Sequence, residues 1–501
     1  MIVVRRYVVG SAPLFPLAVV LALGVMAGFA VRMDSVWLLV SLVLLVSFTC
    51  VTGRWAVVQS VAICLSVGTL GMFLATRQRM KEESAVRFAE YGGVLEVVIA
   101  SEPVEKPKTY AFDVVLTGNG RKLKCYVEKD DRSRVLMPGM GLVMQTVVRP
   151  LQPYRLGRFD YRQYLVRHGF SGQCFVKSHV WQTRSVSVSR LPWLQRVRIQ
   201  FLHWRHQLLS RYRQLGAHDD SYAVLAAMTL GDKSALSRDL RDVYSVTGAS
   251  HVLALSGLHL GILYFVLSWV LLGRWRPSVL SQSLLVAGIW SFAFLVGLPV
   301  SVIRSALMLT VFAVFSLGGR SGASLNTLSF AAILLLLASP DVLYDVGFQL
   351  SFVAVMSILL LMPVFDGWAG KSRLWRHWLV RPLWGVLAVS VAAQAGVAPL
   401  IAYHFGRFST YFLLTNVVVL PCAYLILLGS LLMLLLPWGL LASGVLGVVD
   451  FLNRVLDLIA SLPLASIEGI CLSVFQLVVC YLMLFALYGA LLRLSNLRLW
   501  P

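Results

Sequence analysis

Apolar runs of membrane-spanning length recur along most of this chain and predict a bundle of transmembrane helices. The first three runs cover residues 13–31, 36–52 and 55–75, and each is about long enough to cross a hydrocarbon core of roughly 30 Å. Similar runs continue after residue 219, so we expect about ten to twelve crossings in total. The pattern separates N-terminal helices (1–76) from a polytopic region (219–501).

The pattern changes between residues 77 and 190, where apolar and polar residues alternate over strand-length segments. The segments are 94–100, 112–118, 122–128, 141–149 and 171–177. Five short strands in about a hundred residues are typical of an OB-type barrel, a fold that often binds single-stranded nucleic acid.

Two cysteines, Cys125 and Cys174, lie in these strand-like segments. In an oxidising compartment we expect them to form a disulfide. Two free buried thiols are the alternative, because sequence spacing does not show that the two side chains face each other.

A linking segment, residues 191–218, contains an amphipathic helix at 195–216. Its apolar residues recur at helical spacing and arginines occupy the polar positions, which is typical of a helix lying among lipid headgroups. The basic and aromatic stretch at 371–384 has the same character. We therefore expect membrane lipids as partners of both segments.

Composition and charge fix the class of protein. Hydrophobic residues make up 58% of the chain and charged residues 13%, with a mean hydropathy of +0.77, which excludes a soluble enzyme. Arg5 and Arg6 precede the first span, so the positive-inside rule predicts a cytoplasmic N-terminus and an extracytoplasmic 77–190 segment. The predicted fold class is a polytopic α-helical membrane protein with an inserted extracytoplasmic β-barrel (OB-like) domain.

The net charge of +21 implies an anionic partner, either lipid headgroups or a polyanion. Residues 77–190 contain 20 Lys/Arg and 11 Asp/Glu, a net charge of +9. A long external domain is not subject to the positive-inside rule, so this excess needs another cause, such as an anionic ligand.

The run GASHVLALSGLHLG, residues 248–261, places His251, Ser256 and His259 among apolar residues. On one continuous helix these side chains would lie within an arc of roughly 140°. Polar groups at bilayer depth face a protein interior or a watery cavity, so we expect them to line a polar path. Histidines bonded to neighbouring carbonyls are the alternative. Gly257 and Gly261 are spaced for close helix packing.

Arg304, in the run GLPVSVIRSALM (297–308), is the charge of greatest interest. A guanidinium within a span costs several kcal/mol unless it is paired or hydrated, and its fork of donors matches a phosphate. An ion pair with Asp345 is the alternative. Further candidate path residues in the apolar region are Gln349, His404 and Asn416.

Several separated runs resemble the ComEC family of DNA-uptake channels and occur in that family's order. They are AVLAAMTLGDKSALSRDLRDVYSVTGASHVLALSGLHLGIL, GLPVSVIRSALM, DVLYDVGFQLSFVAV (341–355) and YHFGRFSTYFLLTNVVVLP (403–421). The resemblance, sharpest over 221–421, implies a channel in the bacterial inner membrane that admits one strand of transforming DNA. It also implies an external DNA receptor, cytoplasmic motor or DNA-binding proteins, and a separate nuclease.

Catalytic and energy-coupling motifs are missing from the sequence. Many relatives carry an H-x-H-x-D-H metal run for degrading the second strand, and no such run occurs here. Gly231-Asp232-Lys233-Ser234 lacks the glycine that a phosphate-binding loop needs before its lysine. We therefore expect a transport conduit without catalytic residues, metal or cofactor. Moving DNA toward a negative cytoplasm costs about 2.3 kcal/mol per charge per 100 mV, so the motor must lie elsewhere.

Two other classes of function remain open. A permease for a small anion or solute would use Arg304 as its clamp, although a small solute needs no large basic barrel. An intramembrane serine hydrolase would pair Ser256 with His404. In that case Ala254 stands where the familiar enzymes have a glycine.

Overall fold

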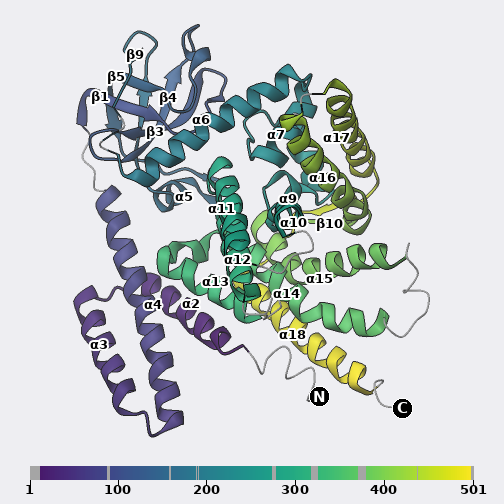
Figure 1. Ribbon diagram of the computed structural model, residues 1–501. Helices are drawn as coiled ribbons and strands as arrows, with labels where there is room; N and C mark the ends of the chain where they lie inside the picture. The colour runs from purple at the N-terminus through teal and green to yellow at the C-terminus, as the bar shows by residue number, and fades with distance from the viewer. Residues whose placement is uncertain are drawn as a thin grey trace.

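A computed structural model describes residues 12–86, 91–156, 159–187, 189, 191–272, 278–317, 325–369, 380–436 and 438–497. It consists of a helical bundle with a β-barrel at one end (Figure 1), which confirms the predicted polytopic helical fold with an inserted barrel domain. Arg5, Arg6 and most of the 371–384 stretch lie outside the described residues.

Three helices form the N-terminal part, α2 (Leu14–Ala30), α3 (Ser35–Val51) and α4 (Ala56–Val86). Helix α4 extends beyond the predicted span and leads toward the barrel (Figure 1). It packs closely against α2, because a Cβ atom on Gly24 would lie only 2.1 Å from the carbonyl oxygen of Gly68. Only glycine permits such an approach of two backbones.

All five predicted strands are present and form a closed barrel. They are β1 (Tyr91–Ile99), β3 (Thr109–Leu116), β4 (Lys122–Glu128), β5 (Gly141–Arg149) and β8 (Phe170–Val176). Their order is β1-β3-β4-β8-β5, with β5 pairing back to β1 and β4 running parallel to β8. Phe112, Leu123 and Leu142 are wholly buried inside. This is the five-stranded order of an OB-type barrel.

Short elements complete this domain: β2 (Val104–Glu105), η1 (Ser133–Val135), β6 (Arg155–Leu156), β7 (Phe159–Asp160), α5 (Tyr161–Arg167) and β9 (Trp181–Thr183). The amphipathic segment is helix α6 (Trp193–Gln214), which joins the barrel to the bundle. It buries Leu202, Leu209 and Tyr212.

The remaining chain is mostly helical. Its elements are α7 (Asp219–Leu230), α8 (Arg238–Val246), α9 (Ser250–Leu253), α10 (Gly257–Leu272), α11 (Val279–Leu295), α12 (Val300–Leu317), α13 (Leu325–Ala338), η2 (Pro340–Tyr344), α14 (Val346–Ala369), α15 (Val380–Phe405), β10 (Arg407–Ser409), α16 (Phe412–Leu435), α17 (Gly439–Ala460), β11 (Ser466–Glu468) and α18 (Val474–Leu497).

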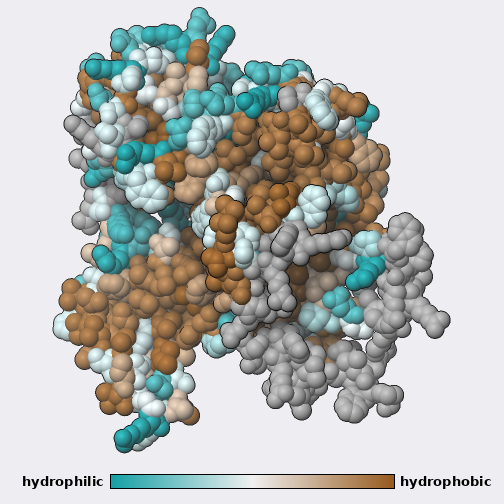
Figure 2. Space-filling model, viewed as in Figure 1, coloured by the Kyte–Doolittle hydropathy of each residue, from teal (hydrophilic) through white to brown (hydrophobic). Residues whose placement is uncertain are grey.

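Among the described residues, six helices are long and apolar enough to cross a membrane, and six shorter apolar helices of 10–17 residues accompany them. Figure 2 shows hydrophobic residues over the N-terminal helices and the helical bundle, and hydrophilic residues gathered over the barrel. The chain is a multi-pass membrane protein.

Candidate functional site

A break in the helical chain positions the first polar residues. Helix α9 ends at Leu253, Ala254 is extended with φ −96° and ψ 124°, and α10 begins at Gly257. The expectation of one continuous helix through 248–261 is therefore wrong, and His251, Ser256 and His259 do not share one helical face. His251 is exposed on α9, with Nδ1 3.0 Å from the Gly248 carbonyl oxygen.

Contacts between Ser256 and His259 cap the helix that begins after the break. The Ser256 backbone N–H donates to His259 Nδ1 at 3.2 Å, and the Ser256 hydroxyl lies 3.1 Å from the same nitrogen. Ser256 thus occupies the N-cap of α10 and His259 the third helical position, as in a capping box. His259 is 1% exposed, and its Nε2 has no hydrogen-bond partner among the described residues.

Arg304 lies on the first turns of α12 and is 3% exposed. Its Nη2 donates to the Ser305 hydroxyl at 3.3 Å, and its Cζ lies 5.7 Å from the ring centre of Phe352 on α14. Its Nε and Nη1 have no partner among the described residues. Among the described residues, Arg304 and Asp345 form no ion pair. Asp345 Oδ1 instead accepts the Phe348 backbone N–H at 2.9 Å.

Hydrogen bonds and close packing bring the start of α10 against α12. The Ser301 hydroxyl donates to the Leu255 carbonyl at 2.8 Å, and a Cβ atom on Gly257 would lie 3.1 Å from the Ser305 hydroxyl. Around Gly261 there is open space, so the predicted two-glycine contact is wrong for Gly261. We call Ser256, His259, Ser301, Arg304 and Ser305 the buried polar cluster.

A second group of polar residues, the α14–α15 cluster, comprises Asp345, Gln349 and His404. His404 Nε2 donates to Gln349 Oε1 at 2.9 Å, which joins the end of α15 to the start of α14. Gln349 Nε2 donates to the Leu343 carbonyl of η2 at 2.9 Å. His404 is therefore engaged by Gln349, whereas Ser256 contacts His259. Asn416 is half-buried on α16.

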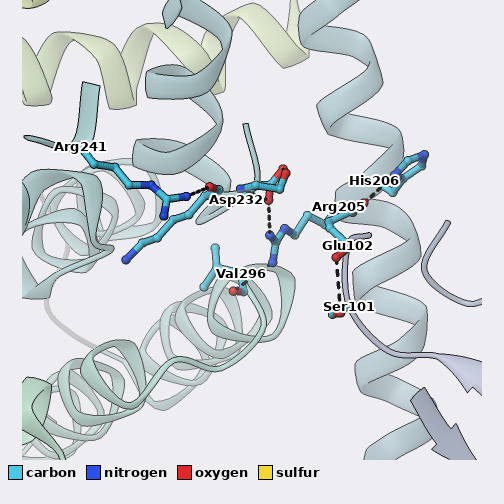
Figure 3. Close-up of polar contacts among 9 residues, drawn as sticks. Ser101, Glu102, Arg205, His206, Asp232, Arg241 and Val296 are labelled. Atoms are coloured by element: carbon cyan, nitrogen blue, oxygen red, sulfur yellow. Dashed lines mark hydrogen bonds and ion pairs between the residues drawn. The ribbon is translucent and has the colours of Figure 1, made fainter. Parts of the chain in front are cut away.

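Helix α6 ties the barrel to these helices through two consecutive residues that sequence reasoning missed. Arg205 forms a buried ion pair with Asp232 at 3.5 Å, between side chains only 10% and 7% exposed, and its Nη1 donates to the Val296 carbonyl at 3.5 Å (Figure 3). His206 Nδ1 lies 3.1 Å from Glu102 Oε2 of the barrel domain. A hydrogen bond donated by the protonated imidazole to the Glu102 carboxylate raises the pKa of His206.

The two barrel cysteines are direct neighbours on the parallel strands β4 and β8. Both Cys125 and Cys174 are wholly buried, and in this structure both are free thiols. The adjacent Cys174 thiol and burial raise the pKa of Cys125. The strand pairing supplies the proximity that spacing alone did not show, and the disulfide itself stays a prediction.

Comparisons with known proteins place the chain near competence proteins. The Competence protein family model matches residues 228–494. ComE operon protein 3 of Bacillus subtilis is 27% identical over 66% of this chain and 43% of its own length. Competence protein ComA of Neisseria gonorrhoeae is 28% identical over 44% of this chain and 31% of its own length. An uncharacterized protein of Aquifex aeolicus is 32% identical over 46% of this chain and 48% of its own length.

The chain thus spans less than half the length of each of these relatives. No solved structure matches it. The matched family region contains the buried polar cluster and the α14–α15 cluster.

Proposed function

Because the chain belongs to the competence protein family, we propose that it conducts one strand of DNA across the bacterial inner membrane during natural transformation. The supporting observation is Arg304, a buried cation among membrane helices with two guanidinium nitrogens, Nε and Nη1, that have no partner in the described residues. An unpaired charge at such a place is costly and marks a path for a charged substrate. Its planar donors fit a phosphate group.

The residues around Arg304 suit transient rather than tight binding. Its charge rests on the Phe352 ring and on one serine hydroxyl, so no carboxylate in the described part has to be displaced before a phosphate binds. Conduction requires binding that is favourable but weak enough to release. The uncharged groups of Ser256, Ser301 and Ser305 can exchange hydrogen bonds with a passing backbone without holding it.

The orientation and partners are part of the proposal. The N-terminus lies in the cytoplasm and the basic barrel faces outward, where it binds the incoming strand. An external receptor delivers the DNA, a cytoplasmic motor or DNA-binding proteins draw it inward, and a separate nuclease removes the second strand. The chain itself uses no metal or cofactor.

One contact favours an enzymatic alternative, since Ser256 and His259 lie within hydrogen-bond distance. A serine hydrolase needs such a base and also a group that orients it. In the described residues Nδ1 of His259 also accepts the Ser256 backbone N–H, and Nε2 has no partner. This arrangement fits a helix cap better than a catalytic pair. Ser256→Ala should therefore retain most DNA uptake, whereas a hydrolase would lose all activity.

The test is DNA import in cells that lack this chain. Labelled duplex DNA should still bind at the surface and remain accessible to added nuclease, and the wild-type chain should restore nuclease-resistant label inside the cell. Ordinary DNA import without the chain would refute the conduit. Loss of small-anion uptake with normal DNA import would identify the permease instead.

A further inference from the structure

Five rings lie side by side along one surface of the barrel domain, and we call them the ring row: Phe175, Tyr126, Tyr161, Tyr164 and His168. Phe175 stacks on Tyr126, with ring centres 4.8 Å apart and planes at 11°. Tyr161 stacks on Tyr164 at 6.2 Å and 14°, and Tyr164 lies 4.0 Å from the His168 ring.

Helix α5 packs against strand β8, which brings Tyr161 close to Tyr126. Burial, and then the nearby Tyr161, raise the pKa of Tyr126 to about 12. The row therefore extends from strands β4 and β8 onto helix α5.

The exposure of these rings exceeds what anchoring α5 to the barrel requires. Phe175 is 52% exposed and Tyr164 is 39% exposed. A further ring, Tyr154, is 58% exposed and meets Tyr161 edge-on at 6.4 Å. The Lys106 ammonium lies 5.4 Å from the ring centre of Tyr126. Exposed aromatic rings alternating with cationic side chains are typical of binding sites for single-stranded nucleic acid, because every base offers a face for stacking.

The far end of the row lies near the α14–α15 cluster. The Arg167 guanidinium lies 4.9 Å from the ring centre of Tyr344, the last residue of η2 and the neighbour of Asp345. Burial raises the pKa of Tyr164, and the nearby Asp345 carboxylate raises it further. Figure 1 shows α5 between the barrel strands and the helices below them. From Asp345 the first turns of α14 lead to Phe352, on which Arg304 rests.

We propose that the ring row guides a single DNA strand across α5 toward Asp345, with unpaired bases packing against the ring faces and edges that remain exposed. The inference rests on the proposed function, and it adds a selection step. Bases in a duplex are already stacked and paired, so only a separated strand can engage the rings. Stacking also predicts little preference for base sequence.

The experiment measures binding of fluorescent oligothymidylate to the full-length chain in lipid nanodiscs. Phe175→Ala and Tyr164→Ala should each weaken single-strand binding at least about fivefold, because each removes an exposed ring surface that a base can pack against. Phe175→Tyr and Tyr164→Phe keep the rings and should bind like the wild type. Trp193→Ala is the matched control, since this ring is 67% exposed at the start of α6 but lies outside the row.

Duplex DNA of the same length should bind equally to all of these proteins, which separates stacking from a general loss of folding. Wild-type single-strand affinity in both alanine variants would overturn the ring row while leaving the conduit in place. Absence of any single-strand binding by the wild-type chain would overturn both. Weakening by Trp193→Ala as large as that by Phe175→Ala would show a general surface effect and also refute the row.

Discussion

Replacing Arg304 by alanine separates a substrate-binding charge from a structural one. A buried arginine in a membrane helix costs up to about 2.5–3.5 kcal/mol on insertion scales, the value for the helix centre. The contact of Arg304 with the Phe352 ring recovers about 2 kcal/mol when desolvated, and its hydrogen bond to Ser305 about 1.5 kcal/mol, the low end for a charged donor. These contributions nearly cancel, so Arg304→Ala should change stability by less than about 1 kcal/mol. Removing one partner of a buried ion pair would instead cost about 3–5 kcal/mol.

DNA import should respond far more strongly than stability. A charge-assisted hydrogen bond contributes about 1.5–3 kcal/mol, so its loss should slow import roughly 10- to 100-fold. Arg304→Lys keeps the charge but not the planar fork and should restore import only in part. The assay compares nuclease-resistant label inside cells with the amount of membrane-inserted protein and with surface-bound DNA.

A matched control is Arg205→Ala, which removes another buried arginine of the same chain, one that is paired with Asp232. We expect that variant to lower protein abundance. If Arg304→Ala also depletes the protein, and Arg304→Ala with Asp345→Ala restores it, Arg304 is a structural partner of Asp345 and the reasoning is refuted.

Three further predictions concern the barrel and its junction with α6. A bridge closing a loop of about fifty residues contributes about 4 kcal/mol, so Cys125→Ser should lower the melting temperature measured without reductant; free alkylation of the wild-type thiols would refute the bridge. Because the pKa of His206 is raised in the folded state, its contact with Glu102 contributes its full stabilisation of the folded protein below pH 6.5, and this stabilisation is lost as pH rises through the higher folded-state pKa. His206→Gln should flatten this pH dependence in limited proteolysis, and an unchanged profile would contradict it. Arg205→Ala should cost about 3–5 kcal/mol, and adding Asp232→Ala should recover much of it; independent effects on unfolding would exclude the pairing.

The sequence predicted the barrel well, because the alternation in segments such as 141–149 is a direct consequence of one buried and one exposed face. It did not predict the break after α9. Ala254 and Leu255 are apolar residues that also suit a continuous helix, and the cap formed by Ser256 and His259 became visible only in the structure.

Long-range pairs lay beyond sequence reasoning for a different reason. Arg205 appeared as one arginine among several on an amphipathic helix, and its partner Asp232 belongs to a loop whose position depends on how α6 packs. The ring row was visible only as scattered tyrosines, because its order depends on β4, β8 and α5 meeting in space.

The central claim, that a DNA strand passes Arg304, is tested most directly by cross-linking a stalled import intermediate. A bromouracil-substituted strand carrying a bulky protein at its trailing end would halt during import, and ultraviolet light would join it to the residues that it touches. The account predicts cross-linked peptides from α12 and from the Phe352 region of α14, in addition to barrel peptides. Cross-links confined to the barrel, while the leading end of the strand has reached the cytoplasm, would contradict it.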